Sequence, residues 1–328
     1  MTGKTNERQG AFMLSFDLEL IWGTLDLYGP EAFRERCETE RRVVIDRLLA
    51  MLEEFKVPAT WFVVGHLFLD RCDGSNGLKH PEIVRPAHAW SQGDWFRHDP
   101  GGREETAPTF LARSVIAKIR NCRVPQEIGC HSFSHVIFGD AGCSRETALS
   151  EVAACMRAAR GIGLEPRAFA FPRNSVGHLD VLTEHGFTSF RGPEPRWYTS
   201  RWCPTFVRRA AHVVDVLAAT EPPVVAPERT PDGLWNIPGS MIFLPMHGVR
   251  RHIPVSMRVR RARKGLAAAV RRGRIFHLWL HPTNLVDSME PLFAGLREVL
   301  AEAAGLRDRG MLSITPMSAA MGDAAPGG

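Results

Sequence analysis

The sequence predicts an α/β protein in which parallel strands form a closed or nearly closed barrel and helices lie outside it. Short apolar runs rich in β-branched and aromatic residues alternate with helical segments about seven or eight times, which is typical of successive strand–helix units. The number and length of these strands favour a barrel over an open doubly wound sheet. No Gly-x-Gly-x-x-Gly or Walker A sequence follows any strand, which weakens a nucleotide-binding alternative.

The first half of the chain supplies three predicted strands and the helices between them. Residues 11–16 form an apolar run that predicts the first strand. Residues 38–56 carry apolar side chains at the helical period, and residues 59–64 form a β-rich run closed by a glycine. Residues 112–122 are expected to be helical, and residues 127–130 form a short buried strand.

The second half repeats the same alternation. A helix is expected over residues 144–160, with Ser144 as a suitable N-cap residue and glycines beyond its end. The proline-rich residues 221–233 are the best candidate for an internal linker or a surface excursion. The remaining expected strands are 167–171, 187–190, 234–237, 275–280 and 311–314, and the remaining helices are 178–185, 204–219, 255–272 and 290–306.

One domain over residues 11–318 is expected to hold all of these elements. Residues 1–10 and 319–328 are expected to be disordered ends. Residues 70–108 interrupt the alternation, and a connection of that length within a compact domain is usually functional or mobile. We interpret it as an ordered flap near a binding site, because its tryptophans can stack on sugar rings. The alternative is a loop whose tryptophans plug into the scaffold.

Composition and charge exclude several classes of protein. The chain of 328 residues is 44% hydrophobic with a net charge of +5, which suits an anionic partner but not a nucleic-acid-binding tail. Its 7 cysteines never form a C-x-x-C pair, so we expect neither a disulfide framework nor a cysteine-containing zinc site. Without a signal peptide or a membrane-spanning run, a soluble cytoplasmic protein is expected.

Potential ligands and catalytic groups lie where the predicted strands end. Asp17 and Glu19 follow the first strand, His131 and His135 follow residues 127–130, and His281 follows residues 275–280. Two imidazoles and a carboxylate can hold one divalent cation with a position open for water, which metal-assisted hydrolysis requires. The alternatives are one core and one surface histidine, and a Glu19 that lies on the surface beyond the strand.

Four stretches together resemble the polysaccharide deacetylases, the NodB-homology group of carbohydrate esterases. Residues 12–19 resemble the family's first motif, and residues 58–65 are similar to its second strand. Residues 127–135 closely match the H-S/T-x-x-H metal motif, and residues 280–282 resemble the late motif that carries a histidine. The resemblance covers nearly the whole chain and implies an irregular (β/α)7 barrel.

The resemblance also implies roles for individual residues. Asp17 would be the general base, with Glu19, His131 and His135 holding one divalent metal ion, most simply zinc; the roles of Asp17 and Glu19 could be exchanged. His281 would be the general acid. The family's arginine before Pro172 is missing here, so Arg173 would orient the base from a shifted position, bind an anionic substrate group, or form a plain salt bridge. Substrate contacts are expected from Trp22, Trp95, Arg191 and Asn284.

These roles predict a metal-dependent hydrolase that removes the N-acetyl group of an amino sugar in a glycan. Ten basic residues and no acidic residue lie within 250–274, so the glycan could bear phosphate or a lipid, or the segment could contact an anionic membrane. A solvated charged helix face is the alternative, and nucleic acid is not expected as a ligand. The rival functions are hydrolysis of another amide, such as a formyl-sugar or a cyclic ureide, and catalytically silent sugar binding.

Overall fold

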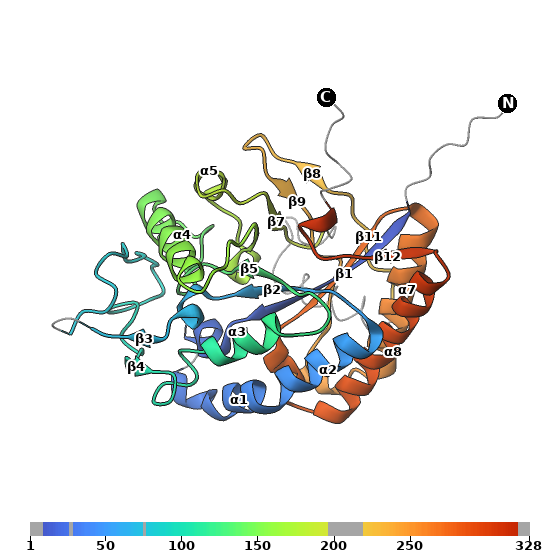
Figure 1. Cartoon of the computed structure of the whole chain (residues 1–328), viewed down its shortest axis with the longest axis horizontal. Helices are drawn as coiled ribbons and strands as arrows, with labels where there is room; N and C mark the ends of the chain where they lie inside the picture. Colours follow the sequence, from blue (N-terminus) through green and yellow to red (C-terminus); the bar gives the residue numbers. More distant parts are fainter. Residues whose placement is uncertain (1–8, 26–28, 75–76, 196–218, 321–328) are drawn as a thin grey trace.

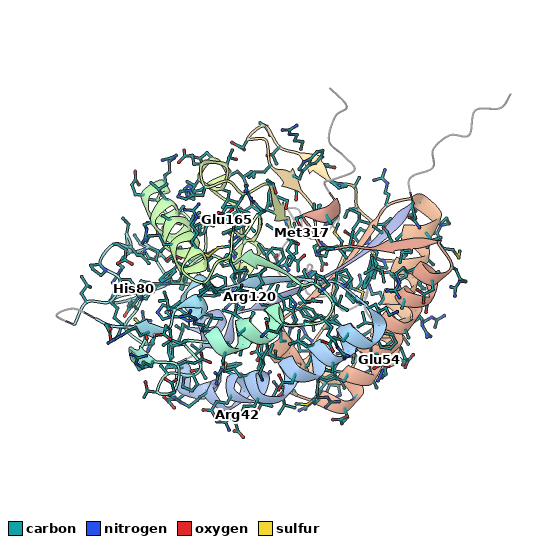
Figure 2. All side chains as sticks on the ribbon, in the orientation of Figure 1. Arg42, Glu54, His80, Arg120, Glu165 and Met317 are labelled. Carbon is teal, nitrogen blue, oxygen red and sulfur yellow. A yellow bond between two sulfur atoms is a disulfide. The ribbon has the colours of Figure 1, made fainter. Side chains whose placement is uncertain are left out.

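A curled sheet of parallel strands forms the centre of the structure, and helices pack around its outer face (Figure 1). The computed structural model describes residues 9–25, 29–74, 77–195 and 219–320. Side chains fill the space between the sheet and the helices, which gives the sheet a core on its outer face (Figure 2).

The sheet and its helices can be followed element by element. The strand order is β10 (Met241–Ile242), β11 (Ile275–Leu280), β1 (Gly10–Leu18), β2 (Thr60–Val63), β5 (Glu127–Cys130), β6 (Ala168–Ala170), β7 (Ser189–Arg191), β9 (Trp235–Asn236) and β8 (Glu228–Arg229), with β12 (Leu312–Ile314) also paired to β1. Only β8, which pairs with β9, is antiparallel among these strands. The α-helices are α1 (Arg34–Thr39), α2 (Ile45–Phe55), α3 (Arg113–Arg120), α4 (Arg145–Arg160), α5 (Leu179–Glu184), α7 (Val255–Arg272) and α8 (Met289–Asp308).

Shorter helical turns connect the strands and the helices. The 3₁₀ turns are η1 (Leu20–Thr24), η2 (Pro30–Ala32), η4 (Gly65–Phe68), η5 (Pro172–Asn174), η7 (Gly248–His252) and η8 (Pro282–Leu285). A π-helical segment, η3 (Glu40–Val44), joins α1 to α2, so the predicted helix over residues 38–56 is continuous but irregular. Several of these turns directly follow strands at their C-terminal ends.

The alternation of side chains along β1 shows how the barrel is filled. Phe12, Leu14 and Phe16 point into the core shared with the helices. Met13 points to the opposite face, where it packs in a separate apolar cluster with Phe62 and other side chains of the barrel interior. The next two interior positions along the strand are polar, so the interior changes from apolar to polar toward the C-terminal end of β1.

One continuous stretch of chain bridges the two sides of the sheet. The amide N–H of Ile237 donates to the carbonyl oxygen of Phe190 in β7. A few residues later, the N–H of Ser240 donates to the carbonyl oxygen of His277 in β11. This crossing, which contains β9 and β10, brings β7 and β11 around a common interior and makes the barrel irregular.

The strand–helix alternation predicted from the sequence is confirmed, with some differences. Residues 127–130, 255–272 and 275–280 form the predicted strand, helix and strand with unchanged bounds. Of the two alternatives for residues 221–233, the linker is wrong, because Val225 bridges to Ile275 and β8 forms a hairpin with β9. A surface excursion agrees with β8, which is exposed at the edge of the sheet. Proline-rich composition indicated a break, but the backbone pairs with the sheet. The helix predicted at 204–219 and the two chain ends lie almost wholly outside the described residues.

The flap over residues 70–108 has little regular structure of its own. Its two ends pair as a short antiparallel ladder of β3 (Arg71–Cys72) and β4 (Gly102–Arg103). The indole N–H of Trp95 donates to the backbone oxygen and the hydroxyl of Ser134, so the flap is attached to the loop after β5. The ladder and this contact make the flap an ordered part of the barrel surface.

Two of the cysteines are paired in the structure. Cys130 of β5 and Cys155 of α4 form a disulfide, which the scattered cysteine pattern did not predict. It joins a strand to the helix that packs on it, so residues 25 positions apart meet through the fold.

Among the described residues, none of the helices combines the length and the apolar character needed to cross a lipid bilayer.

Candidate metal and catalytic site

The two acidic residues of the candidate site stand at the C-terminal end of β1. The strand extends through Asp17 to Leu18, and Glu19 is the first residue beyond it. Asp17 follows Met13 and Ser15 on the interior face, so the strand period directs its carboxylate into the barrel. Leu20, with φ of 48°, adopts a left-handed conformation that turns the chain sharply after Glu19. Both carboxylates therefore face the same opening of the barrel.

His131 and His135 are placed by a tight loop that is not a helical turn. Ser132 and His135 have φ values of 57° and 64°, a left-handed conformation that costs free energy for residues other than glycine. The buried carboxylate of Glu151 in α4 holds the loop, because it accepts hydrogen bonds from the backbone N–H groups of Phe133 and Ser134. The strained turn directs both imidazoles toward the end of β1.

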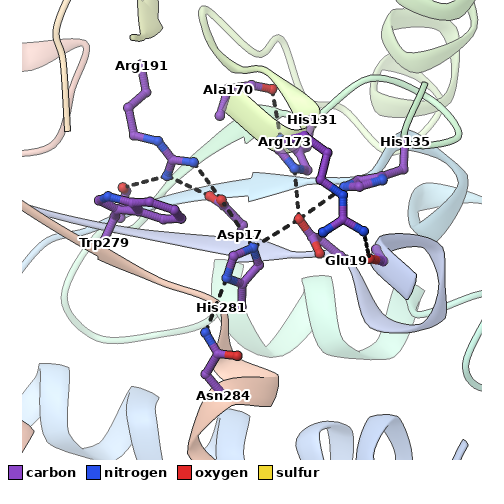
Figure 3. Close-up of polar contacts among 12 residues, drawn as sticks. Asp17, Glu19, His131, His135, Ala170, Arg173, Arg191, Trp279, His281 and Asn284 are labelled. Carbon is purple, nitrogen blue, oxygen red and sulfur yellow. Dashed lines mark hydrogen bonds and ion pairs between the residues drawn. The ribbon is translucent and has the colours of Figure 1, made fainter. Parts of the chain in front are cut away.

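Glu19 lies between three imidazole rings (Figure 3). Its Oε1 atom is 3.0 Å from Nε2 of His131, 3.2 Å from Nε2 of His135 and 3.2 Å from Nε2 of His281. Burial alone would raise the pKa of Glu19, but His281 and His135 hold it well below its usual range. The carboxylate is therefore ionised and aimed at nitrogen atoms.

The chemistry of these donors fits a bound cation. Nδ1 of His131 donates to the carbonyl oxygen of Ala170 at 2.8 Å, so in the neutral ring Nε2 presents its lone pair to Glu19. Burial lowers the pKa of His135, which favours the neutral ring that a metal ion requires. Two lone pairs and a carboxylate facing one point repel one another until a cation lies between them. Glu19, His131 and His135 can hold a metal ion.

Asp17 is held by Arg191, which projects from the end of β7. Nη1 and Nη2 of Arg191 donate to Oδ1 and Oδ2 of Asp17 at 2.7 and 2.5 Å. Nη1 also donates to the hydroxyl of Ser15, which is hydrogen-bonded to Nε2 of His277 at 2.9 Å. Burial alone would raise the pKa of Asp17, but Arg191 and the neighbouring histidines lower it. This fork fixes the orientation of the carboxylate.

His281 completes the cluster from the turn after β11. Its Nε2 atom is 3.7 Å from Oδ2 of Asp17, and its Nδ1 atom is 3.3 Å from the amide nitrogen of Asn284. Burial would lower the pKa of His281, but Glu19 and Asp17 raise it above its usual value. With 24% of its side chain exposed, His281 is the member of the cluster that solvent and ligands reach most easily.

The other residues predicted to belong to the site differ in their burial and in their contacts. Arg173 donates from Nη2 to the carbonyl oxygen of Gly23, and it is Arg191 that contacts Asp17. Trp22 is buried and its indole N–H donates to Phe110, so it is part of the scaffold. Trp95 is half-buried beside the histidine loop. The sequence analysis expected Arg191 to contact the substrate and did not pair it with Asp17 across the barrel.

Comparisons with solved structures agree with this architecture. A protein from Mycobacterium smegmatis named as a polysaccharide deacetylase aligns with a TM-score of 0.64 at 17% identity, over 98% of this chain and 92% of that one. One so named from Pseudomonas aeruginosa PAO1 aligns with a TM-score of 0.58 at 12% identity, over 94% and 89%. The chain has the fold of the polysaccharide deacetylases. The irregular (β/α)7 barrel implied by the sequence resemblance is thereby confirmed.

One of the aligned structures is named as an allantoinase and not as a deacetylase. The structure of Puue Allantoinase aligns with a TM-score of 0.60 at 11% identity, over 96% of this chain and 90% of that one. The sequence matches neither a family model nor a curated protein. The solved structures share their fold with this chain.

Proposed function

We propose that the protein is a metal-dependent amide hydrolase that removes the N-acetyl group of an amino sugar. The observation that carries the proposal is the convergence of Glu19, His131 and His135 beside an arginine-held Asp17. A divalent cation held by the first three would polarise the amide carbonyl and lower the pKa of a water molecule. Zinc is the metal we expect, because imidazole and carboxylate ligands with an open position suit it.

Asp17 is placed to receive the proton of the attacking water. Arg191 engages both carboxylate oxygens, so the side chain cannot rotate away from the barrel opening. The same pairing keeps Asp17 ionised, as a general base must be. Because Glu19 lies nearer the two ligand histidines, the arrangement favours Asp17 as base and Glu19 as ligand.

His281 is placed to donate a proton to the departing amine. Asn284 contacts Nδ1, which orients the ring and leaves Nε2 directed toward the carboxylates. Glu19 and Asp17 raise its pKa, which suits a proton donor, and its partial exposure admits a leaving group. Asp17 lies near the end of β1, and His281 directly follows the neighbouring strand β11.

The flap offers a surface suited to a sugar ring. A small cleft is lined by Leu25, Trp90, Ser91, Trp95, Arg97 and His98. Trp90 is 44% exposed, and Trp95 connects the cleft to the histidine loop through Ser134. An aromatic wall with polar neighbours is a common way to bind carbohydrate, which supports an amino-sugar substrate.

The basic segment 250–274 supports a phosphate-bearing or lipid-linked substrate less than its composition suggested. Arg258 is buried and donates to four backbone carbonyl oxygens, those of Leu244, Pro245, Arg250 and Ile253. Arg263 contacts Glu302, and Arg271 and Arg272 both contact Glu221. Exposed Arg251 and Arg260 are the side chains on which we base contact with a phosphate or an anionic membrane.

A second candidate is hydrolysis of another amide, such as a cyclic ureide. The observation that favours it is the TM-score of 0.60 to Puue Allantoinase, which lies between those of the two deacetylase structures. The catalytic groups described above would serve either amide. A panel of N-acetylated amino sugars, N-formylated amino sugars and cyclic ureides, assayed for acid release and ring opening, would separate the two.

The proposal is tested by metal content and acetate release measured on the same preparations. We expect His135→Ala to lose the ion of this site and to abolish acetate release, because one of three ligands is gone. His185→Ala, which alters a histidine at the end of α5 outside the site and the flap cleft, should leave both unchanged. Full activity of His135→Ala, or release of acetate from no amino sugar at any metal loading, would contradict the proposal.

A further inference from the structure

A second cluster of potential metal ligands lies at the base of the flap. It consists of His66 in η4, Cys72 in β3, His80 in the loop that follows, and Asp99 shortly before β4. One ligand atom of each residue lies within 4.8 Å of all the others. His80 is labelled in Figure 2, where it stands in the flap away from the centre of the sheet.

The four ligand atoms form a closed ring of contacts. Nε2 of His66 is 3.0 Å from Nε2 of His80, which is 3.2 Å from Sγ of Cys72. Sγ is 2.9 Å from Oδ2 of Asp99, which is 3.2 Å from Nε2 of His66. Ligands about 2.0–2.3 Å from tetrahedral zinc are about 3.3–3.8 Å apart, so a small outward shift of each side chain would admit the ion.

The outer atoms of these side chains are fixed by further contacts, as metal ligands usually are. Nδ1 of His66 lies 2.9 Å from the carbonyl oxygen of Phe110, and Nδ1 of His80 lies 3.6 Å from a carboxylate oxygen of Glu82. Protons on those nitrogens leave both Nε2 lone pairs facing the same point. Oδ1 of Asp99 accepts from the N–H of Gly101, so Oδ2 is the oxygen aimed inward.

The surroundings largely shield the cluster from water. The side chains of His66 and Asp99 are fully buried, and that of His80 is 11% exposed. Aromatic rings pack around the two imidazoles: the centroid of Trp22 is 4.5 Å from that of His66, and those of Phe96 and Phe133 are 4.8 and 5.0 Å from that of His80. Four inward-facing ligands under an aromatic cover leave no position open for a substrate.

We propose that the flap holds a structural zinc ion through His66, Cys72, His80 and Asp99. Nitrogen, sulfur and carboxylate ligands in a closed set of four are the chemistry of structural zinc. Binding would convert the Cys72 thiol to a thiolate and release its proton to solvent, while Asp99 binds as a carboxylate. The absence of a C-x-x-C pair argued against such a site in the sequence, but the fold assembles it from four separate positions.

The ion would connect the flap to the loop that carries the candidate catalytic histidines. The N–H groups of Gly65 and His66 donate to the carbonyl oxygens of Ser132 and Phe133 at 2.8 and 2.9 Å. Phe133 also packs against the rings of both His66 and His80. Fixing His66 therefore fixes the backbone between His131 and His135, whether or not the candidate catalytic site works as proposed.

The metal content of five forms of the full-length protein tests the inference. Purified after expression with zinc, the wild type should hold two ions per chain, and Cys72→Ser and His135→Ala should hold one each. Cys143→Ser is the matched control, because Cys143 is also a buried free cysteine but lies outside the cluster, and it should keep both ions. The double variant Cys72→Ser/His135→Ala should hold none.

A cobalt spectrum makes the test independent of whether Cys72→Ser folds. His135→Ala loaded with Co²⁺ should show the intense visible bands of tetrahedral cobalt and a near-ultraviolet thiolate-to-metal band, since its flap cluster is intact. A single ion in the wild type that His135→Ala removes, with no thiolate band, would overturn the inference and make the cluster a hydrogen-bonded network. An ion that only Cys72→Ser removes would support the inference and contradict the proposed function.

Discussion

The two ligand clusters of this protein differ in number, type and exposure of their side chains. The catalytic cluster offers Glu19, His131 and His135, and it opens to solvent beside His281, whose side chain is 24% exposed. The flap cluster offers four ligands including a thiol, and aromatic rings cover it. Structural metal sites are closed by four protein ligands, whereas catalytic sites keep one position open. The difference indicates chemistry at one cluster and attachment of the flap at the other.

The largest expected effect separates reaction from metal binding at the open cluster. Asp17→Asn keeps the shape of the side chain but removes the base, so kcat should fall by about 10²–10⁴. Metal content should stay as in the wild type, because Glu19 and the two histidines are unchanged. Steady-state acetate release and elemental analysis of one preparation check both parts. Loss of the ion in Asp17→Asn would instead make Asp17 the ligand and exchange its role with Glu19.

The pKa values of buried carboxyl groups near the two clusters shift in opposite directions. At the flap, burial would raise the pKa of Asp99, but hydrogen bonds with His66 and Cys72 lower it to about 2. Behind the catalytic cluster, burial raises the pKa of Glu40 from 4.5 to about 8. Repulsion by the nearby carboxylate of Glu19 raises the pKa of Glu40 further. Glu40 therefore stays protonated in the native state at pH values where the unfolded chain releases the proton.

Replacing Glu40 should change how stability depends on pH. The stability linked to its proton is fully present below about pH 4.5 and is lost as the pH rises to about 8, a difference of at most about 5 kcal/mol. Glu40→Gln should remove that loss, so its free energy of unfolding relative to the wild type should increase between pH 5 and pH 8.5. Urea unfolding of chelator-treated protein measures it, with exposed Glu35→Gln as control. A constant difference across this range would show that Glu40 titrates normally.

How far the sequence predicts these clusters depends on how local their signals are. His131 and His135 lie on one loop, and Asp17 and Glu19 lie at the end of one strand, so spacing and strand position were enough to predict that they meet. The bounds of β5, β11 and α7 followed equally directly from apolar runs and helical period. Because the C-terminal ends of parallel strands meet at one opening of a barrel, residues at several strand ends can be predicted to lie close together.

The flap cluster and the partner of Asp17 depend on contacts that no local pattern records. Cys72 and Asp99 lie 27 positions apart in an irregular segment, and their approach follows from the ladder of β3 with β4. Arg191 reaches Asp17 over a separation of 174 positions, because β7 and β1 line the same interior. The pairing of Val225 with Ile275 was hidden in the same way by a proline-rich composition.

The smallest expected effect compares the two arginines near the open cluster. Arg191→Lys keeps the charge but cannot donate two parallel hydrogen bonds to Asp17, so kcat should fall about 10-fold to 100-fold. Arg173→Lys, which alters a side chain that donates to the carbonyl oxygen of Gly23, should change kcat no more than about 3-fold by the same reasoning. Both variants should keep two metal ions, since neither arginine is a ligand. Steady-state kinetics on the preferred amino sugar measures the ratio, and a larger loss in Arg173→Lys would return the base-orienting role to the position that the sequence indicated.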